Sequence, residues 1–300
     1  MAMMRLCLKR ELWLTLPVFV IFHSGPSVYL RGMNSTRAFC LCLLTACPAF
    51  AQGVTQSDVL QGKFRPGWQT ANGTHMSALH LQLAPQWKTY WRAPGDAGIP
   101  PSFDWSGSRN VGSVRFHWPA PEVFRTNGLQ TVGYHDELVL PFEVTPKDPT
   151  QPIHLQAQVD LGVCKDICMP ASLMLSVDLP PQGKADSTIR DALKARPASA
   201  NEAGVKAMRC EVEPIGDGLR VIAQMDLTRQ GPEEVVVFEP GVPGVWVSQS
   251  DVGRDGSTLR AVAEMVPPNG QPFALDRGAM RVTVIGTGGR AVEIIGCPAP

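Results

Sequence analysis

The sequence predicts an all-β protein that contains two β-sandwich domains joined by a short helical linker. Three observations support this fold class. The 27 prolines and 28 glycines among 300 residues interrupt helical periodicity. Short segments of alternating apolar and polar residues recur along the chain, as in half-buried strands. Turn-forming residues separate these segments. Beyond the N-terminal leader, a single short stretch has a helical pattern.

The N-terminal segment 1–51 reads as a leader, and its part 33–51 has the pattern of a secretory signal peptide. Arg37 supplies the positive charge, and a short apolar run follows it. Ala49-Phe50-Ala51 then forms a small-x-small cleavage site. The sequence therefore predicts export from the cytoplasm, with cleavage after Ala51.

Two ambiguities concern where the leader starts and how it ends. Met33 is the expected start codon, so residues 1–32 are expected to be an extension of the gene model. Leu44-Thr45-Ala46-Cys47 also resembles a lipoprotein cleavage box, which would leave the protein tethered through Cys47. Simple cleavage is favoured because the small-x-small site follows an apolar run of better size.

Charge and hydrophobicity restrict the class of protein. The full chain has 27 basic and 27 acidic residues; five basic residues and one acidic residue lie in 1–51, which leaves 22 against 26, a net charge of −4. This balance does not suggest a nucleic-acid surface. No apolar run reaches the roughly 18 residues that span a bilayer. We therefore expect a periplasmic protein whose four remaining cysteines lie in an oxidising compartment.

The segment 53–181 is expected to form the first sandwich. Residues 79–83, 111–118 and 138–144 have strand patterns, whereas 92–101 contains too many proline and glycine residues for regular structure and is expected to be a loop. The histidines of this part are dispersed without metal-ligand spacing, so the sequence predicts no metal site and no cofactor.

The rest of the chain is expected to form a linker, 182–205, and a second, smaller sandwich, 206–300. A short helix over 186–195 is expected in the linker, capped by Asp186 or Ser187. The expected strands of the second sandwich are 206–212, 218–227, 234–238, 245–248, 258–265, 281–285 and 291–295.

Two closely spaced cysteines lie at the end of a predicted hairpin. From 153 to 163 the odd-numbered residues are apolar, and the same parity is apolar again from 169 to 179. If Lys165-Asp166-Ile167 is a three-residue loop, then every apolar residue faces another one across the hairpin. Cys164 then faces Cys168 on the polar side.

This placement favours a disulfide that opens and closes. Directly opposed Cβ atoms lie roughly 4.5–5.5 Å apart, more than the roughly 3.5–4.5 Å of a relaxed disulfide. A strained, exposed disulfide is typical of exchange chemistry. Lys165 favours a thiolate and Asp166 opposes it, so the attacking cysteine stays open. Two alternatives remain: an inert structural staple, and a Cu(I) site made by both thiolates with Met169 and a histidine.

The other two cysteines, Cys210 and Cys297, lie near the first and last strands of the second sandwich. Cys210 shares the apolar parity of its strand. A bridge between them closes a loop of roughly 90 residues, which is worth about 4–5 kcal/mol in the chain-entropy model. We expect a structural disulfide.

The first sandwich also resembles a known family. The residues that carry this likeness are WKTY at 87–90, WP at 118–119, YHDELVLPFEV at 134–144 and GVCKDICMP at 162–170. Over residues 70–180 the chain is similar to the N-terminal periplasmic domain of DsbD-type thiol:disulfide interchange proteins, including the ScsB branch. Its best-known members separate the two cysteines by five residues, whereas three separate them here.

The resemblance implies an immunoglobulin-like fold and a thiol-disulfide oxidoreductase of the protein-disulfide reductase type. It places electron relay on Cys164 and Cys168. It makes Phe124 the candidate aromatic residue of a cap loop over the cysteines, and Tyr90 the candidate active-site tyrosine. The implied partners are a membrane-embedded thiol reductase of the DsbD or CcdA kind, acting in trans, and periplasmic thioredoxin-like or other disulfide substrates. No cofactor is implied.

Overall fold

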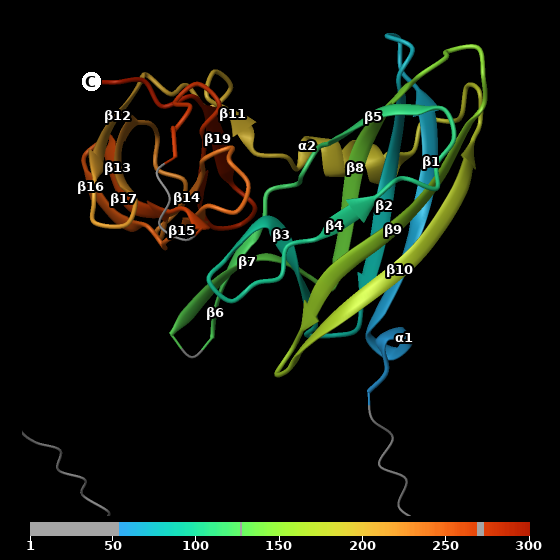
Figure 1. Ribbon diagram of the computed structural model, residues 1–300, viewed down its shortest axis with the longest axis horizontal. Coiled ribbons are helices and arrows are strands. Elements are labelled where there is room, and N and C mark those ends of the chain that lie inside the picture. The colour runs from blue at the N-terminus through green and yellow to red at the C-terminus, as the bar shows by residue number, and fades with distance from the viewer. Residues whose placement is uncertain (1–53, 127, 269–272) are drawn as a thin grey trace, which may run out of the picture. The chain divides into compact units, whose positions relative to one another are not determined.

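The computed structural model describes residues 54–126, 128–268 and 273–300 (Figure 1). The expected leader, with its start at Met33 and the alternative anchor at Cys47, lies outside these residues. The described chain consists of four β-sheets and two short helices, α1 (Gln56–Val59) and α2 (Ser187–Lys194), which confirms the predicted all-β class. Neither of these helices has the length to cross a membrane.

Two antiparallel sheets build the first sandwich. The strand order is β1-β2-β8-β5 in one sheet and β10-β9-β3-β7-β6 in the other, where β4 also pairs with β9. The strands are β1 (Leu60–Gln69), β2 (His75–Leu83), β3 (Lys88–Gly95), β4 (Ser102–Asp104), β5 (Val111–Phe116), β6 (Glu122–Thr126), β7 (Leu129–His135), β8 (Glu137–Pro146), β9 (Ile153–Cys164) and β10 (Cys168–Leu179). Apolar residues of both sheets form one core, in which Trp91, Leu140 and Phe142 are fully buried.

The expectation that 92–101 is a loop throughout was wrong, because β3 continues to Gly95. Its register against β7 shifts between Tyr90 and Gly95. Such an irregularity in a strand accommodates Pro94, which has no amide hydrogen to donate to a neighbouring strand. The loop proper comprises the shorter segment 96–101.

Helix α2 lies where the linker helix was predicted. The side chain of Asp186 accepts hydrogen bonds from the backbone N–H groups of Thr188 and Ile189, as an N-cap residue does. Ile189 is fully buried against Met76 and Ala78 of β2, so the helix packs on the first sandwich.

The C-terminal part contains the other two sheets, with orders β11-β19-β18-β14 and β12-β13-β17-β15, where β16 also pairs with β17. Its strands are β11 (Ala198–Ser199), β12 (Ala207–Pro214), β13 (Leu219–Asp226), β14 (Val235–Glu239), β15 (Trp246–Val247), β16 (Asp251–Asp255), β17 (Thr258–Val266), β18 (Arg281–Ile285) and β19 (Ala291–Ile295). Strand β16 was not predicted from the sequence. The linker was expected to include the residues of β11, whereas β11 pairs with β19 in parallel.

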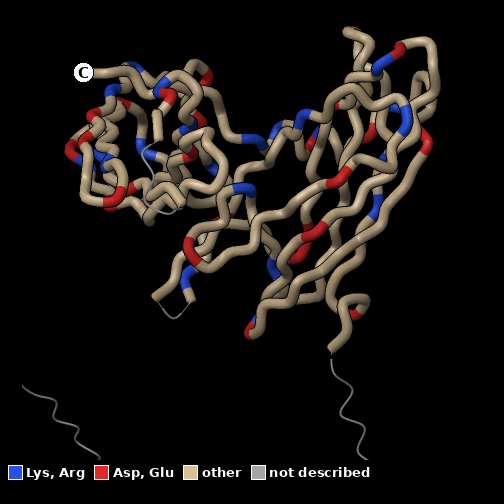
Figure 2. Tube along the Cα trace, viewed as in Figure 1, with Lys and Arg blue, Asp and Glu red and all other residues tan. Residues whose placement is uncertain are grey.

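A second hydrophobic core lies between these two sheets and includes Met225, Leu259, Met265 and Val282. Residues 53–300 nevertheless form one compact unit, and Ile285 packs into the core of the first sandwich. The division into domains at 181 and 206 therefore stays a prediction. Along the described trace, basic and acidic residues are interspersed (Figure 2).

Candidate redox site

The two closely spaced cysteines lie at the tip of a long hairpin formed by β9 and β10, drawn in yellow-green in Figure 1. The predicted register is confirmed: Cys164 is opposite Cys168, Val163 is opposite Met169, and Leu161 is opposite Ala171. The structure joins Cys164 and Cys168 by a disulfide, with their Cα atoms 4.2 Å apart. The strict alternation of the two strands therefore places both sulfur atoms on the sheet face that points away from the core.

Burial distinguishes the two cysteines. Cys164 is almost completely buried, with 2% of its surface exposed, whereas Cys168 is an exposed residue. The expectation that both sulfur atoms face solvent was therefore wrong for Cys164. The strand order gives the reason, because β9 lies between β10 and β3, whereas β10 is the edge strand. An approaching partner can reach Cys168 more readily than Cys164.

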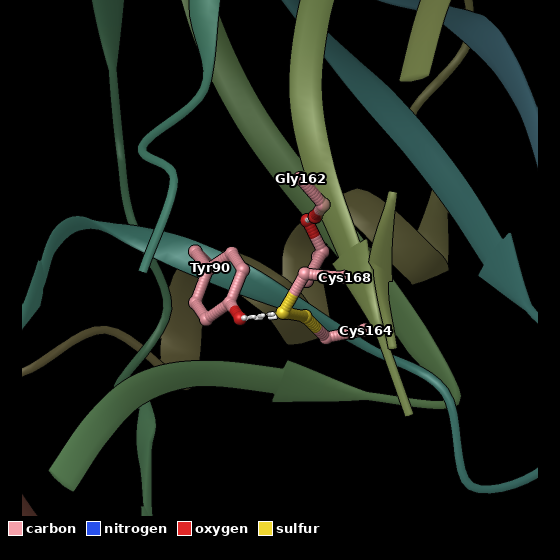
Figure 3. The surroundings of a disulfide bond; sticks show 5 residues. Tyr90, Gly162, Cys164 and Cys168 are labelled. Carbon is pink, nitrogen blue, oxygen red and sulfur yellow. Dashed lines mark hydrogen bonds between the residues drawn. A yellow bond between two sulfur atoms is a disulfide. The ribbon is translucent and has the colours of Figure 1, made fainter. Parts of the chain in front are cut away.

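The side chain of Tyr90 points at the disulfide (Figure 3). Its hydroxyl donates to the Sγ atom of Cys164 at 2.9 Å and lies 3.3 Å from the Sγ atom of Cys168. Tyr90 is 1% exposed, and this burial raises the pKa of its hydroxyl. The group therefore stays protonated, and remains a hydrogen-bond donor, when a thiolate forms beside it.

A glycine and a loop residue complete the surroundings of Tyr90. A Cβ atom added to Gly162 would lie 3.1 Å from the Tyr90 ring and 2.8 Å from the Cβ atom of Ile99. The loop 96–101 therefore packs close to β9 and to the ring of Tyr90. The sequence analysis did not find Ile99; the proline and glycine residues that flank it mark a loop but do not show where the loop packs.

Phe124, the candidate cap residue, lies in β6, three strands from β9 in the order β9-β3-β7-β6. The Nζ atom of Lys88 is 5.0 Å from the centroid of its ring. The ring of His135 lies edge-on to it, with the centroids 6.2 Å apart. Of these two residues, Lys88 is opposite Cys164 and His135 lies one strand further away, so a cap role for Phe124 remains a prediction.

The hairpin loop carries the two charged residues that the sequence analysis placed beside the cysteines. Lys165 and Asp166 are both exposed. Neither forms an ion pair with another described residue in the structure. Their opposite charges lie next to each other in the chain, so they largely cancel at a distance.

The geometry disfavours the copper alternative. Met169 is opposite Val163 in the hairpin and packs against the hydrophobic core. Its thioether therefore lies on the sheet face opposite to the one that carries the sulfur atoms of Cys164 and Cys168.

The second disulfide joins Cys210 in β12 to Cys297, which follows β19. Cys210 is completely buried and Cys297 is 1% exposed. The Nη1 atom of Arg277 donates to the backbone carbonyl of Cys210 at 2.8 Å. Burial keeps reagents away from both of these cysteines, in contrast to Cys168, which is an exposed residue.

Comparison with protein families adds to this geometry. Residues 57–177 match the family described as thiol:disulfide interchange protein DsbD, N-terminal. This segment is similar to the DsbD N-terminal family. The match covers less than half of the chain and includes both cysteines of the hairpin, Tyr90 and Phe124. No curated protein matches the sequence significantly.

A solved structure extends the likeness in fold beyond the DsbD N-terminal segment. The chain is similar to the crystal structure of the N-terminal periplasmic domain of ScsB from Proteus mirabilis, with a TM-score of 0.60 and 21% sequence identity. The alignment covers 80% of this chain and 92% of that chain. It therefore reaches past residues 57–177, so part of the fold outside the family match is shared as well.

Proposed function

We propose that the protein is a periplasmic thiol:disulfide interchange module that relays electrons through Cys164 and Cys168. The observation that carries this proposal is the asymmetry of the pair. One cysteine is an exposed residue on an edge strand, the other is buried, and the hydroxyl of Tyr90 contacts the sulfur atoms of both. The match of residues 57–177 to the DsbD N-terminal family supports it.

The exposed sulfur is the point of attack. A thiolate of the electron donor attacks the Sγ atom of Cys168, so a new S–S bond forms and the bond to Cys164 breaks. The electron pair of the broken bond stays on the Cys164 sulfur, where the Tyr90 hydroxyl donates a hydrogen bond to it. Cys164 is then the leaving group, and the stability of its thiolate controls the rate of the exchange step. A second donor thiolate attacks the mixed disulfide and releases Cys168 as a thiolate.

The reduced pair passes its electrons on by the same chemistry. The Cys168 thiolate attacks a disulfide of the substrate, one substrate sulfur leaves as a thiolate, and a mixed disulfide forms. The Cys164 thiolate then attacks the Sγ atom of Cys168, which releases the second substrate thiolate and restores the disulfide. The substrate is reduced by two electrons and the pair is oxidised by two, so no cofactor is needed.

The partners follow from this chemistry and from the family. We infer that a membrane-embedded thiol reductase of the DsbD or CcdA kind supplies the electrons. The acceptors are periplasmic thioredoxin-like proteins or other proteins with a disulfide to be reduced. The similar ScsB domain is described as periplasmic, which supports the same compartment for this chain.

Trapping of mixed disulfides tests the proposal. In Cys164→Ser the resolving sulfur is missing, so mixed disulfides through Cys168 should accumulate with periplasmic proteins and survive non-reducing electrophoresis. In Cys168→Ser the remaining sulfur is buried, so far fewer adducts are expected. Cys210→Ser is the control for a thiol outside the hairpin. If neither hairpin variant forms more adducts than this control, electron relay through this pair is refuted.

A further inference from the structure

A lysine lies beside the buried sulfur on the outer face of the sheet. Lys88 in β3 is opposite Cys164 in β9, and on its other side it is opposite His135 in β7. Directly opposed residues of antiparallel strands project to the same face, with Cβ atoms roughly 4.5–5.5 Å apart. The register therefore places Lys88, Cys164 and His135 in one row across the sheet.

The ammonium group of Lys88 is held by an aromatic ring and not by a carboxylate. Its Nζ atom lies 5.0 Å from the centroid of the Phe124 ring, a cation–π contact. In the described part of the chain, no carboxylate forms an ion pair with it. The nearby acidic side chains of Glu122 and Asp136 contact His135, at 3.0 and 3.4 Å. Among the described residues the positive charge of Lys88 thus has no direct ionic partner, and the ring over which it lies belongs to β6, on the side of β3 away from β9.

This charge acts differently on the two redox states. The disulfide is neutral, so a nearby cation does little for it. Reduction places a negative charge on the Cys164 sulfur, which is 2% exposed, and a buried charge without a partner is unfavourable. Burial also lowers the pKa of Lys88, so an anion beside it would favour its charged form as well.

We propose that Lys88 is the cation that stabilises the Cys164 thiolate. The inference rests on the proposed function, because it assigns the charge that stabilises the leaving sulfur of that reaction. It involves one exchange step: the bond between Cys164 and Cys168 breaks, a bond between Cys168 and the partner sulfur forms, and the electron pair of the broken bond remains on Cys164. Tyr90, from the same strand as Lys88, supplies the hydrogen bond to that sulfur.

The test is the pKa of the Cys164 thiol in a protein that carries Cys168→Ser. Cys164 is then the free thiol of the hairpin, and its ionisation can be followed by the ultraviolet absorbance of the thiolate during a pH titration. Adding Lys88→Met is expected to raise this pKa by about one unit, a tenfold loss of thiolate at a given pH below it. Adding Lys88→Arg keeps the charge and should leave the pKa within about 0.3 unit of the parent.

Lys165→Met is the matched control. It also removes the charge of a lysine, the one that follows Cys164 in the chain and is exposed in the hairpin loop. It should shift the pKa by less than about a third of the Lys88→Met effect. An unchanged pKa in Lys88→Met, or an equal shift in Lys165→Met, overturns the inference. If Lys88→Met does not fold, as judged by circular dichroism, Lys88→Gln decides: a rise of the Cys164 pKa by about one unit supports the inference, and no rise overturns it.

This titration needs no partner protein, so the two proposals can fail separately. Absence of trapped mixed disulfides in Cys164→Ser refutes electron relay, whatever the titration shows. A normal yield of trapped adducts together with an unchanged pKa in Lys88→Met refutes only the role of Lys88.

Discussion

Replacement of Tyr90 by phenylalanine should make the Cys164–Cys168 disulfide harder to reduce. The hydroxyl lies 2.9 Å from one sulfur and 3.3 Å from the other. A hydrogen bond to a charged acceptor contributes about 1.5–3 kcal/mol, whereas a neutral disulfide sulfur is a weak acceptor. The reduced form with a Cys164 thiolate therefore loses about 1–2 kcal/mol more than the oxidised form does. For a two-electron couple, this corresponds to a reduction potential about 20–40 mV more negative.

The assay equilibrates the protein with glutathione redox buffers and measures the reduced fraction by alkylation of free thiols. Tyr134→Phe is the matched control, since Tyr134 is also buried but its hydroxyl donates to the backbone carbonyl of Pro119 at 2.9 Å. Its reduction potential should equal that of the parent protein. A potential for Tyr90→Phe within about 10 mV of the parent, or a less negative one, would refute the assigned role of the hydroxyl.

Three further changes test other parts of the structure. Gly162→Ala places a methyl group 2.8 Å from the Cβ atom of Ile99 and should displace the loop 96–101, so dithiothreitol should reduce the hairpin disulfide several-fold faster. Gly253→Ala is the control, because its added methyl group meets no atom within 4 Å. Equal reduction rates in both variants would contradict this packing. Cys210→Ser removes a disulfide between residues 87 positions apart and should lower the free energy of unfolding by about 4–5 kcal/mol in urea titrations. The reduction potential of the Cys164–Cys168 pair should stay unchanged. A loss of stability below about 1 kcal/mol would show that the bridge is not structural. Asp186→Ala removes the N-cap of α2 and should lower the free energy of unfolding by about 1 kcal/mol at neutral pH. Despite burial, an arginine partner and the cap hydrogen bonds hold the pKa of this carboxyl below 3.8, so its stabilising contribution is present above that pH and is lost as the pH falls through the folded-state pKa. A loss of stability in Asp186→Ala that persists in full at lower pH would count against the cap.

The hairpin could be predicted residue by residue because its information is local. A side-chain period of two and a three-residue loop fix which residues of β9 and β10 face each other, and the observed register agrees with this. The parity also placed Cys164 and Cys168 together on the polar side. The N-cap of α2 was predictable for the same reason, since Asp186 directly precedes the helical pattern.

The burial of Cys164 could not be predicted from the hairpin alone. It depends on β3, which enters the sheet from more than 70 positions earlier in the chain and pairs with β9 through Lys88 and Thr89. The same strand brings Tyr90 to the sulfur atoms. Family resemblance identified Tyr90 and Phe124 as candidates, but it did not show that Lys88 lies opposite Cys164 and contacts the ring of Phe124.

The pairing of β9 with β10 has a consequence for the lifetime of any adduct. The two strands are joined by backbone pairing over Ile153–Cys164 and Cys168–Leu179, and this pairing does not depend on a bond between the sulfur atoms. The Cys164 thiolate is therefore presented to a neighbouring mixed disulfide at a high effective concentration, without a search through backbone conformations. Ring closure should outrun capture by a second molecule, so each encounter ends in release of the partner and not in a persistent covalent pair.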